Sequence, residues 1–230
     1  MVDDGGGDRH SRAASPELIT DPTEKAEKEA RNALQQFDIA IKLIDDWLLT
    51  PERPFKLRPS LIQQLHRIAL DGLSAFAGNW RPAGVEILGS KHEPVGAHLV
   101  AASVEEMCDY VNEKWNQQTA INLAAYSMWR LNWIHPFDDG NGRTSRMLSY
   151  IILCVRSGQH LPGKNTIPEQ ISQDKTPYYR ALDAADDAFR HSRIDVSVLE
   201  EMLSGMLANQ LVEVYQDATG SNRGLDEGLT

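Results

Sequence analysis

The sequence has little cysteine, little positive charge and no long apolar run, and each shortage narrows what the protein can be. Its two cysteines, Cys108 and Cys154, stand at a spacing that matches no zinc or redox motif, so we expect two reduced core thiols. The 23 Lys and Arg against 33 Asp and Glu give a formal net charge of −10, which argues against nucleic acid or an anionic membrane as the main partner. No apolar run reaches the roughly 18 residues of a membrane span, and residues 1–17 are too polar for a secretory signal. We therefore expect a cytoplasmic protein.

The chain of 230 residues has helical periodicity along most of its length. Residues 1–20 are expected to form a disordered leader. Residues 21–50 predict a helix, because Asp21 can cap it and Pro22 suits its first position. Apolar residues recur in this helix at spacings of three and four, which predicts one buried stripe. The stripe comprises Leu34, Phe37, Ile41, Ile44 and Leu48. Residues 206–230 are expected to hold the end of a C-terminal helix and a polar tail.

A stretch rich in glycine and proline, residues 77–103, interrupts the helices. Short β-type pieces at VEIL (85–88) and HLV (98–100) predict a loop followed by a small hairpin. The periodic segments on both sides amount to about seven helices, so the predicted fold class is all-α with one small hairpin. His66, in the helix before this stretch, is expected to be a surface or hydrogen-bonded core residue rather than a ligand.

The stretch HPFDDGNGRTSR, residues 135–146, has the composition of a functional loop. Its Asp-Gly and Asn-Gly pairs are hairpin signals between strands, but the helical periods on both sides favour a loop that opens a helix. Such a loop presents unpaired backbone N–H groups and the positive end of the helix dipole to an anion. Gly140 and Gly142 would let a phosphate approach the backbone. Arg143 and Arg146, one turn apart, suit bidentate phosphate contacts.

Three further residues of this stretch could act on what the loop holds. Asp138 or Asp139 could hold Mg²⁺, a hard cation that proteins bind through a carboxylate together with substrate phosphates. His135 titrates near neutral pH and could take a proton from an attacking hydroxyl. Each residue alone also has a structural interpretation, as part of a turn, a helix face or the core. A zinc hydrolase would need more ligands than one histidine. Residue chemistry and spacing thus predict a phosphate-binding loop with a candidate base, without naming the substrate.

The complete stretch resembles the signature of the Fic (Fido) family: His, any residue, Phe, any residue, Asp or Glu, Gly, Asn, Gly, Arg, any two residues, Arg. All eight fixed positions are met, by His135, Phe137, Asp139, Gly140, Asn141, Gly142, Arg143 and Arg146. Flanking segments are similar too, and the similarity covers roughly residues 60–205. The resemblance implies a Fic-type helical bundle with a small β-hairpin flap. It also implies AMP transfer from ATP to a Ser, Thr or Tyr hydroxyl of a protein, with self-modification included.

The same resemblance implies roles for individual residues along one ATP molecule. His135 would be the general base, and Asp139 would carry Mg²⁺. The loop and its arginines would bind the nucleotide phosphates through Asp139, Gly140, Asn141, Gly142, Arg143 and Arg146. Tyr178 or Tyr179 would contact adenine. The flap would align an extended target segment by main-chain pairing, along Val85, Ile87, Leu88 and Gly89.

The donor and the regulation stay open at this point. The Doc branch of the family, which phosphorylates its target, has Lys at the position of Gly142; glycine favours nucleotidyl transfer, and phosphocholine-transferring relatives share it. Many family members carry an inhibitory helix whose glutamate pairs with the second motif arginine, here Arg146. No segment matches its pattern fully, and we expect a degenerate version in the N-terminal helix, with Glu29 or Glu27 facing Arg146. The main alternative is a nucleotide-sensing or partner-binding module without transfer activity. Removal of AMP and a homo-oligomer are also left open.

Overall fold

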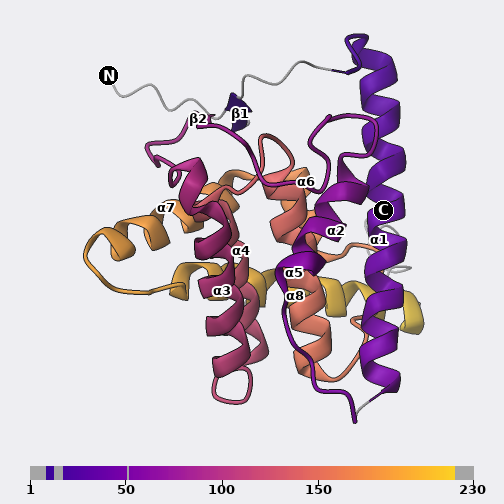
Figure 1. Ribbon diagram of the computed structural model, residues 1–230. Coiled ribbons are helices and arrows are strands. Elements are labelled where there is room, and N and C mark those ends of the chain that lie inside the picture. The colour runs from indigo at the N-terminus through magenta and orange to yellow at the C-terminus, as the bar shows by residue number, and fades with distance from the viewer. Residues whose placement is uncertain (1–8, 13–17, 51, 221–230) are drawn as a thin grey trace, which may run out of the picture.

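The structure is a computed structural model that describes residues 9–12, 18–50 and 52–220. Within these residues the chain forms eight α-helices, one 3-10 helix (η1, Ala97–Leu99) and two short strands, β1 (His10–Arg12) and β2 (Glu86–Leu88). The α-helices are α1 (Pro22–Leu49), α2 (Pro59–Ala69), α3 (Val100–Lys114), α4 (Ala120–Ile134), α5 (Asn141–Ser157), α6 (Ile167–Gln173), α7 (Thr176–Arg190) and α8 (Ser197–Thr219). The predicted all-α class is confirmed (Figure 1).

Helices α4 and α5 form the centre of the bundle. They pack against each other, and residues 135–140 join them. Helices α1, α2 and α6 contact α5, while α3, α7 and α8 contact α4. Both central helices are buried around most of their circumference, as expected for helices covered on several sides. The loop that joins them is therefore supported by two rigid, packed elements, which suits a precisely arranged site.

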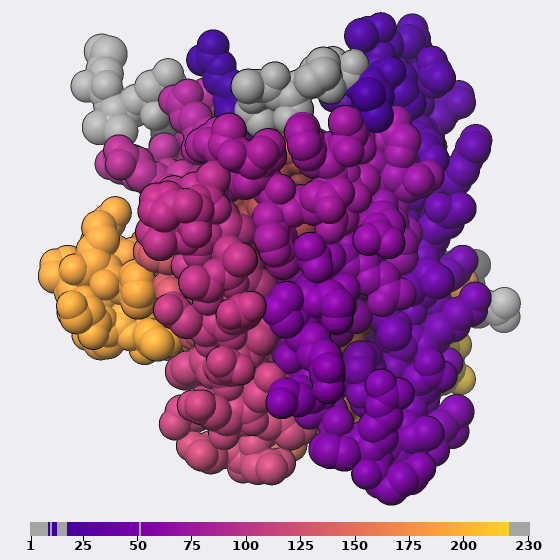
Figure 2. All heavy atoms as spheres, in the orientation of Figure 1, coloured from indigo at the N-terminus to yellow at the C-terminus, as the bar shows by residue number. Residues whose placement is uncertain are grey.

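Helix α1 begins where its capping residues predict. The Asp21 carboxylate accepts a hydrogen bond from the Glu24 N–H at 2.8 Å, and Pro22 occupies the first turn. In Figure 2 this helix runs along one side of the molecule, at the right of the view. Because α1 also contacts α2 and α5, it is part of the bundle and lies against the helix that follows the loop.

Side-chain amides, as well as apolar residues, join α1 to α2. Leu34, a member of the predicted apolar stripe, is 70% exposed, whereas Asn32 and Gln36 are buried. Asn32 donates to two carbonyl oxygens at and just beyond the end of α2, at 3.2 and 2.8 Å, and Gln36 donates to a third at 2.9 Å. The Ala69 carbonyl is one of the last of α2, which lack partners within the helix, so the buried Asn32 amide satisfies it. Periodicity of apolar residues cannot detect this arrangement.

The two strands form a small antiparallel sheet in place of the predicted hairpin. Strand β2 lies in VEIL as predicted, but its partner is β1, with Ser11 opposite Ile87. The HLV piece falls instead in η1 and the first residue of α3. The Leu99 N–H bonds to the Gly96 carbonyl at 2.9 Å, so this segment is hydrogen-bonded within its own turn rather than to β2. The prediction of a hairpin is therefore wrong.

Strand β1 also corrects the prediction of disorder for residues 10–12, within the predicted leader of residues 1–20. A strand with an open edge presents unpaired N–H and C=O groups that a further strand can satisfy. Residues 10–12 do this for β2 (Figure 1). Residues 1–8 and 13–17, and residues 221–230 of the predicted polar tail, lie outside the described residues. None of the described helices has the length and apolar character needed to cross a membrane.

Candidate active site

The loop between α4 and α5 is bounded by two residues in the left-handed conformation. His135 ends α4 with φ 52°, and Gly140 precedes α5 with φ 73°. This conformation costs a non-glycine residue roughly 1–2 kcal/mol, so the surroundings must hold His135 in place. Its N–H bonds to the Leu131 carbonyl at 2.9 Å, and its carbonyl accepts from Nε of Arg81 at 2.7 Å. The predicted loop that opens a helix is confirmed.

His66 supports this loop from α2, a role that the sequence did not indicate. Its ring stacks on Phe137, with centroids 3.6 Å apart and planes at 5°. Nδ1 accepts from the Gly78 N–H at 2.9 Å, which leaves the ring proton on Nε2, 3.0 Å from the Asp139 carbonyl. Burial lowers the pKa of His66 from 6.5 to about 4, so the ring is neutral near pH 7. The expectation of a hydrogen-bonded core histidine is confirmed.

Arg81 connects the loop between α4 and α5 to the flap through hydrogen bonds. This guanidinium is 3% exposed, and it donates to three backbone carbonyls, of His135, Ala83 and Val95. Its own N–H bonds to the Pro136 carbonyl at 2.9 Å. The flap and the histidine therefore share one buried cation, so a displacement of either would disturb both. The stretch GNWRPAG contains this arginine, but its sequence does not show what the arginine contacts.

The His135 imidazole is buried and neutral near pH 7. Nδ1 lies 3.3 Å from the Asn132 carbonyl oxygen. Since a carbonyl can only accept, this contact places the proton on Nδ1 and leaves Nε2 as a hydrogen-bond acceptor. Burial lowers the pKa of His135 from 6.5 to about 4, and the Asn132 contact opposes this shift only in part. The Ser11 hydroxyl lies 2.8 Å from Nε2.

Asp138 and Asp139, which the sequence leaves as alternatives, take different positions. The Asp138 carboxylate is 5% exposed and accepts from the Asp139 N–H at 3.1 Å, so it shapes the loop. The Asp139 carboxylate borders the cavity and contacts the Gly140 N–H at 2.6 Å and Nη2 of Arg143 at 3.1 Å. The described residues contain no group of three His, Cys, Asp or Glu that could enclose a metal ion. A single carboxylate beside a phosphate site suits Mg²⁺, so Asp139 fits that ion.

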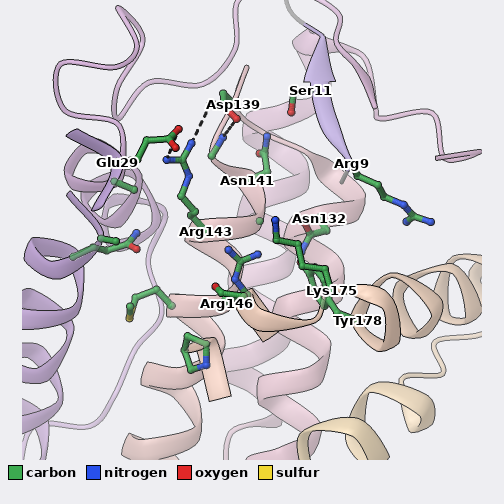
Figure 3. Close-up of a pocket in the computed structure, with 18 of the residues that line it drawn as sticks. Arg9, Ser11, Glu29, Asn132, Asp139, Asn141, Arg143, Arg146, Lys175 and Tyr178 are labelled. Carbon is green, nitrogen blue, oxygen red and sulfur yellow. Dashed lines mark hydrogen bonds and ion pairs between the residues drawn. The ribbon is translucent and has the colours of Figure 1, made fainter. Parts of the chain in front are cut away.

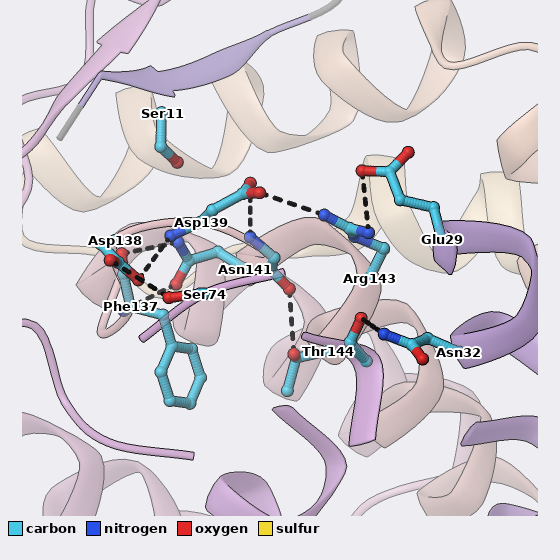
Figure 4. A network of polar contacts seen from close by, with 12 residues as sticks. Ser11, Glu29, Asn32, Ser74, Phe137, Asp138, Asp139, Asn141, Arg143 and Thr144 are labelled. Carbon is cyan, nitrogen blue, oxygen red and sulfur yellow. Dashed lines mark hydrogen bonds and ion pairs between the residues drawn. The ribbon is translucent and has the colours of Figure 1, made fainter. Parts of the chain in front are cut away.

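The two motif arginines line the cavity from the first turns of α5. Arg143 contacts two carboxylates, those of Asp139 and of Glu29 on α1, at 3.1 and 3.3 Å (Figure 4). The expected pairing of the N-terminal helix with Arg146 is therefore corrected, because Glu29 pairs with the first motif arginine. The other candidate, Glu27, is exposed and lies outside the residues that line the cavity. The amide contacts with α2 fix the rotation of α1 and thereby turn Glu29 toward α5.

A cavity of about 1100 Å³ lies over the start of α5, large enough for a small-molecule ligand. In Figure 3, Arg143 and Arg146 point into it, with Glu29 to one side and Tyr178 on the other. Six cationic side chains line the cavity against four acidic ones. The cationic residues are Arg9, Lys25, Arg143, Arg146, Lys164 and Lys175. This local excess of positive charge, in a chain of net charge −10, favours an anionic ligand.

Both tyrosines proposed for adenine line this cavity. Tyr178 is 1% exposed, its hydroxyl lies 3.3 Å from Oγ of Ser145, and the Arg146 guanidinium lies 6.0 Å from its ring centre. Tyr179 accepts a hydrogen bond from the Arg9 N–H at 3.2 Å. Tyr178 therefore forms a fixed part of the cavity wall, and Tyr179 is hydrogen-bonded to the N-terminal segment.

The flap contributes Ile87, Ser90 and His92 to the lining of the cavity. Of the four residues predicted there, Ile87 lines the cavity, whereas Leu88 is 44% exposed. Val85 precedes the strand, and Gly89 follows it with φ 78°. Successive side chains of a strand point to opposite faces, which explains why Ile87 faces the site and its neighbour does not.

Comparison with known proteins shows which family this chain is similar to. The sequence model of the Fic/DOC family matches residues 56–153, from α2 through the loop and into α5. Protein adenylyltransferase Fic of Drosophila willistoni is 30% identical over 158 residues, which are 68% of this chain and 29% of that protein. The chain thus spans less than a third of the length of this curated relative.

Solved structures show the same fold. Fic-1 of C. elegans aligns with a TM-score of 0.65 at 22% identity, covering 88% of this chain and 55% of that one. The BepC protein of Bartonella tribocorum, whose structure holds bound AMPPNP, aligns with a TM-score of 0.54 at 14% identity, covering 82% of this chain and 88% of that one. At these identities the likeness establishes the fold.

Proposed function

The chain belongs to the Fic/DOC family, and we propose that it transfers AMP from ATP to a hydroxyl side chain of a protein. One observation carries the proposal: a neutral His135, whose Nε2 is a hydrogen-bond acceptor, lines the same cavity as the first turn of α5 with its two arginines. The adenylyltransferase name of the 30% identical relative and the ATP analogue bound to BepC support the same choice of donor.

The start of α5 would hold the nucleotide phosphates. Its first N–H groups have no partner within the helix and carry the positive end of the dipole. The backbone at Asn141 and Gly142 would surround the transferred phosphate, and Arg143 and Arg146 would hold the other two. A Cβ at Gly142 would lie 3.1 Å from Nη1 of Arg146, so glycine leaves that arginine room to reach the phosphates. Tyr178 or Tyr179 would contact adenine.

The transfer uses His135 to move one proton. The target hydroxyl gives its proton to Nε2 and attacks the α-phosphorus, and the bond from that phosphorus to the bridging oxygen breaks, so that pyrophosphate leaves. The flap would hold the target segment in extended form along Ile87. Asp139 would hold Mg²⁺, which when bound neutralises charge on the α- and β-phosphates.

The decisive experiment follows the label of ATP into protein. With the purified chain, a lysate and Mg²⁺, label from α-labelled ATP should appear on protein, and it should disappear in His135→Ala. His160→Ala is the matched control, because His160 bonds to Asp45 at 2.8 Å away from the cavity and should leave transfer intact. Transfer from γ-labelled ATP alone would show that the reaction is phosphorylation. Nucleotide binding without any transfer would favour the sensing module.

We further propose that Glu29 restrains the enzyme from α1. Its carboxylate pairs with Arg143, which would otherwise be available to a phosphate. The pair is partly exposed and is therefore worth no more than about 1 kcal/mol to stability, so its removal should leave the fold intact. Glu29→Gln should raise the rate of AMP transfer, whereas Glu27→Gln, an exposed change on the same helix, should not. Equal rates in the two variants would refute this restraint.

A further inference from the structure

A serine of the N-terminal strand contacts the candidate base. Strand β1 places Ser11 opposite Ile87 of the flap, and the Ser11 hydroxyl lies 2.8 Å from Nε2 of His135. Figures 3 and 4 show this side chain pointing from β1 toward the loop that carries Asp139. Because Nδ1 of His135 donates to Asn132, Nε2 is the acceptor and Ser11 is the donor. A general base needs this geometry to take a proton from an acceptor hydroxyl.

Contacts that do not involve the hydroxyl also hold β1 in place. Arg9, just before the strand, donates its N–H to the Tyr179 hydroxyl at 3.2 Å. Its guanidinium lies 2.6 Å from the Asp183 carboxylate and 4.7 Å from the centre of the Tyr179 ring. Main-chain pairing with β2 holds the other side of the strand. Arg9 and the flap thus position the segment, and Ser11 is the side chain that it presents to His135.

We propose that Ser11 is a self-modification site, which accepts AMP from ATP within the same molecule; this assignment rests on the proposed function and adds its acceptor. Oγ of Ser11 forms a bond to the α-phosphorus. The bond between that phosphorus and the oxygen bridging to the β-phosphate breaks, and pyrophosphate leaves. The hydroxyl proton passes to Nε2 of His135 and from there to solvent.

The location of Ser11 in the same chain as the site has a kinetic consequence. An acceptor attached to its own enzyme is present at a high effective concentration, which does not change when the protein is diluted. The rate constant for self-modification should therefore be independent of protein concentration. A separate target protein would have to displace β1 from the flap.

The test maps the label in the complete chain. The wild type and Glu29→Gln are incubated with ATP and Mg²⁺ and then cleaved by a Glu-specific protease. Glu17 is the first glutamate of the sequence, so cleavage releases residues 1–17 with both Ser11 and Ser15. Fragmentation in the mass spectrometer should place one AMP group on Ser11, at a rate constant that does not vary with protein concentration.

Variants separate the hydroxyl from the strand that carries it. Ser11→Ala should reduce self-modification to background, and Ser11→Thr, which restores a hydroxyl, should recover it. Ser15→Ala is the matched control in the same fragment and should leave the label unchanged. Arg9→Ala removes the contacts with Asp183 and the Tyr179 ring and should slow the labelling of Ser11 several-fold.

If Ser11 carries no label, the labelling of lysate proteins shows whether only the Ser11 assignment fails or the proposed function fails as well. Labelled lysate proteins, with Ser11 unlabelled, would overturn the Ser11 assignment and leave the proposed function standing. No label on any protein would overturn both. Labelling of Ser11 that accelerates in proportion to protein concentration would overturn the intramolecular step. Ser11→Ala should still label lysate proteins, which shows that this variant is folded.

Discussion

Replacing Gly140 by alanine should destabilise the protein through two separate effects. The left-handed backbone, with φ 73°, costs an alanine about 1–2 kcal/mol. The new Cβ would also overlap Cδ2 of Leu70 and lie 3.1 Å from its Cγ. Leu70 is 1% exposed and packed on all sides, so making room costs about 1–3 kcal/mol more. The expected loss in the free energy of unfolding is therefore about 2–5 kcal/mol.

Gly158 offers a matched control, because its backbone is similar but its surroundings are open. Its φ is 70°, and no atom lies within 4 Å of a Cβ placed there. Gly158→Ala should therefore lose only the backbone contribution, about 1–2 kcal/mol. Urea unfolding of the wild type and both variants measures the two losses, provided that the dependence on urea is unchanged.

Activity gives the second readout of the same change. Gly140 lies between Asp139 and the start of α5, so the shift that accommodates a Cβ moves the phosphate site. AMP transfer by the folded Gly140→Ala variant should fall strongly, while Gly158→Ala should transfer at the wild-type rate. An equal loss of stability in the two variants would refute the close approach of the loop to Leu70.

Three further predictions concern the protonation of two buried histidines, the hydrogen bonds between α1 and α2, and the two cysteine thiols. Burial lowers the pKa of His66 and of His135 from 6.5 to about 4, so the unfolded chain binds more protons between these values. The free energy of unfolding should therefore fall as the pH falls from 6.5 to 4, by on the order of 3 kcal/mol per histidine; urea titrations at stepped pH test this, and constant stability over that range would contradict it. Asn32→Ala should cost about 1–3 kcal/mol in the same assay, because it removes the amide that bonds to one buried and one partly buried carbonyl; an unchanged midpoint would show that water replaces the amide. Burial raises the pKa of Cys108 to about 12 and that of Cys154 to about 11, so both should resist alkylation until urea unfolds the chain, and rapid labelling of the native protein would contradict their burial.

Local signals predicted the start of α1 and the central loop. Asp21 and Pro22 fix the start of α1 through contacts within one turn, so their sequence is sufficient to locate it. The loop between α4 and α5 follows from the helical periods on both sides and from the glycines between them. These features depend on residues that are close together in the sequence, so the sequence alone is enough to predict them.

Contacts between distant residues could not be predicted in this way. The partner of β2 is a three-residue strand about 76 residues earlier, and HSR lacks the alternating apolar pattern of a strand. His66 is 73 residues from the Asp139 carbonyl that it holds. The residue type at such a position allows several roles, and only the folded chain selects one.

The N-terminal segment meets the site at two chemically distinct points. Glu29 engages Arg143, the proposed partner of a phosphate, and Ser11 engages His135, the proposed base for the acceptor hydroxyl. ATP would compete with Glu29 for Arg143 without removing Ser11, whereas a target protein would compete with β1 without removing Glu29.

The Glu29–Arg143 contact and the Ser11–His135 contact should therefore act independently. Glu29→Gln should accelerate the modification of Ser11 and of other proteins alike, because both reactions need the same phosphate contacts. Ser11→Ala should abolish self-modification without changing the gain that Glu29→Gln gives on other proteins. The two contacts share no residue, so the effects of Glu29→Gln and of Ser11→Ala on the activation free energy for transfer to other proteins should add in the double variant. A gain that disappears in Ser11→Ala would show that β1 and α1 are released as one unit.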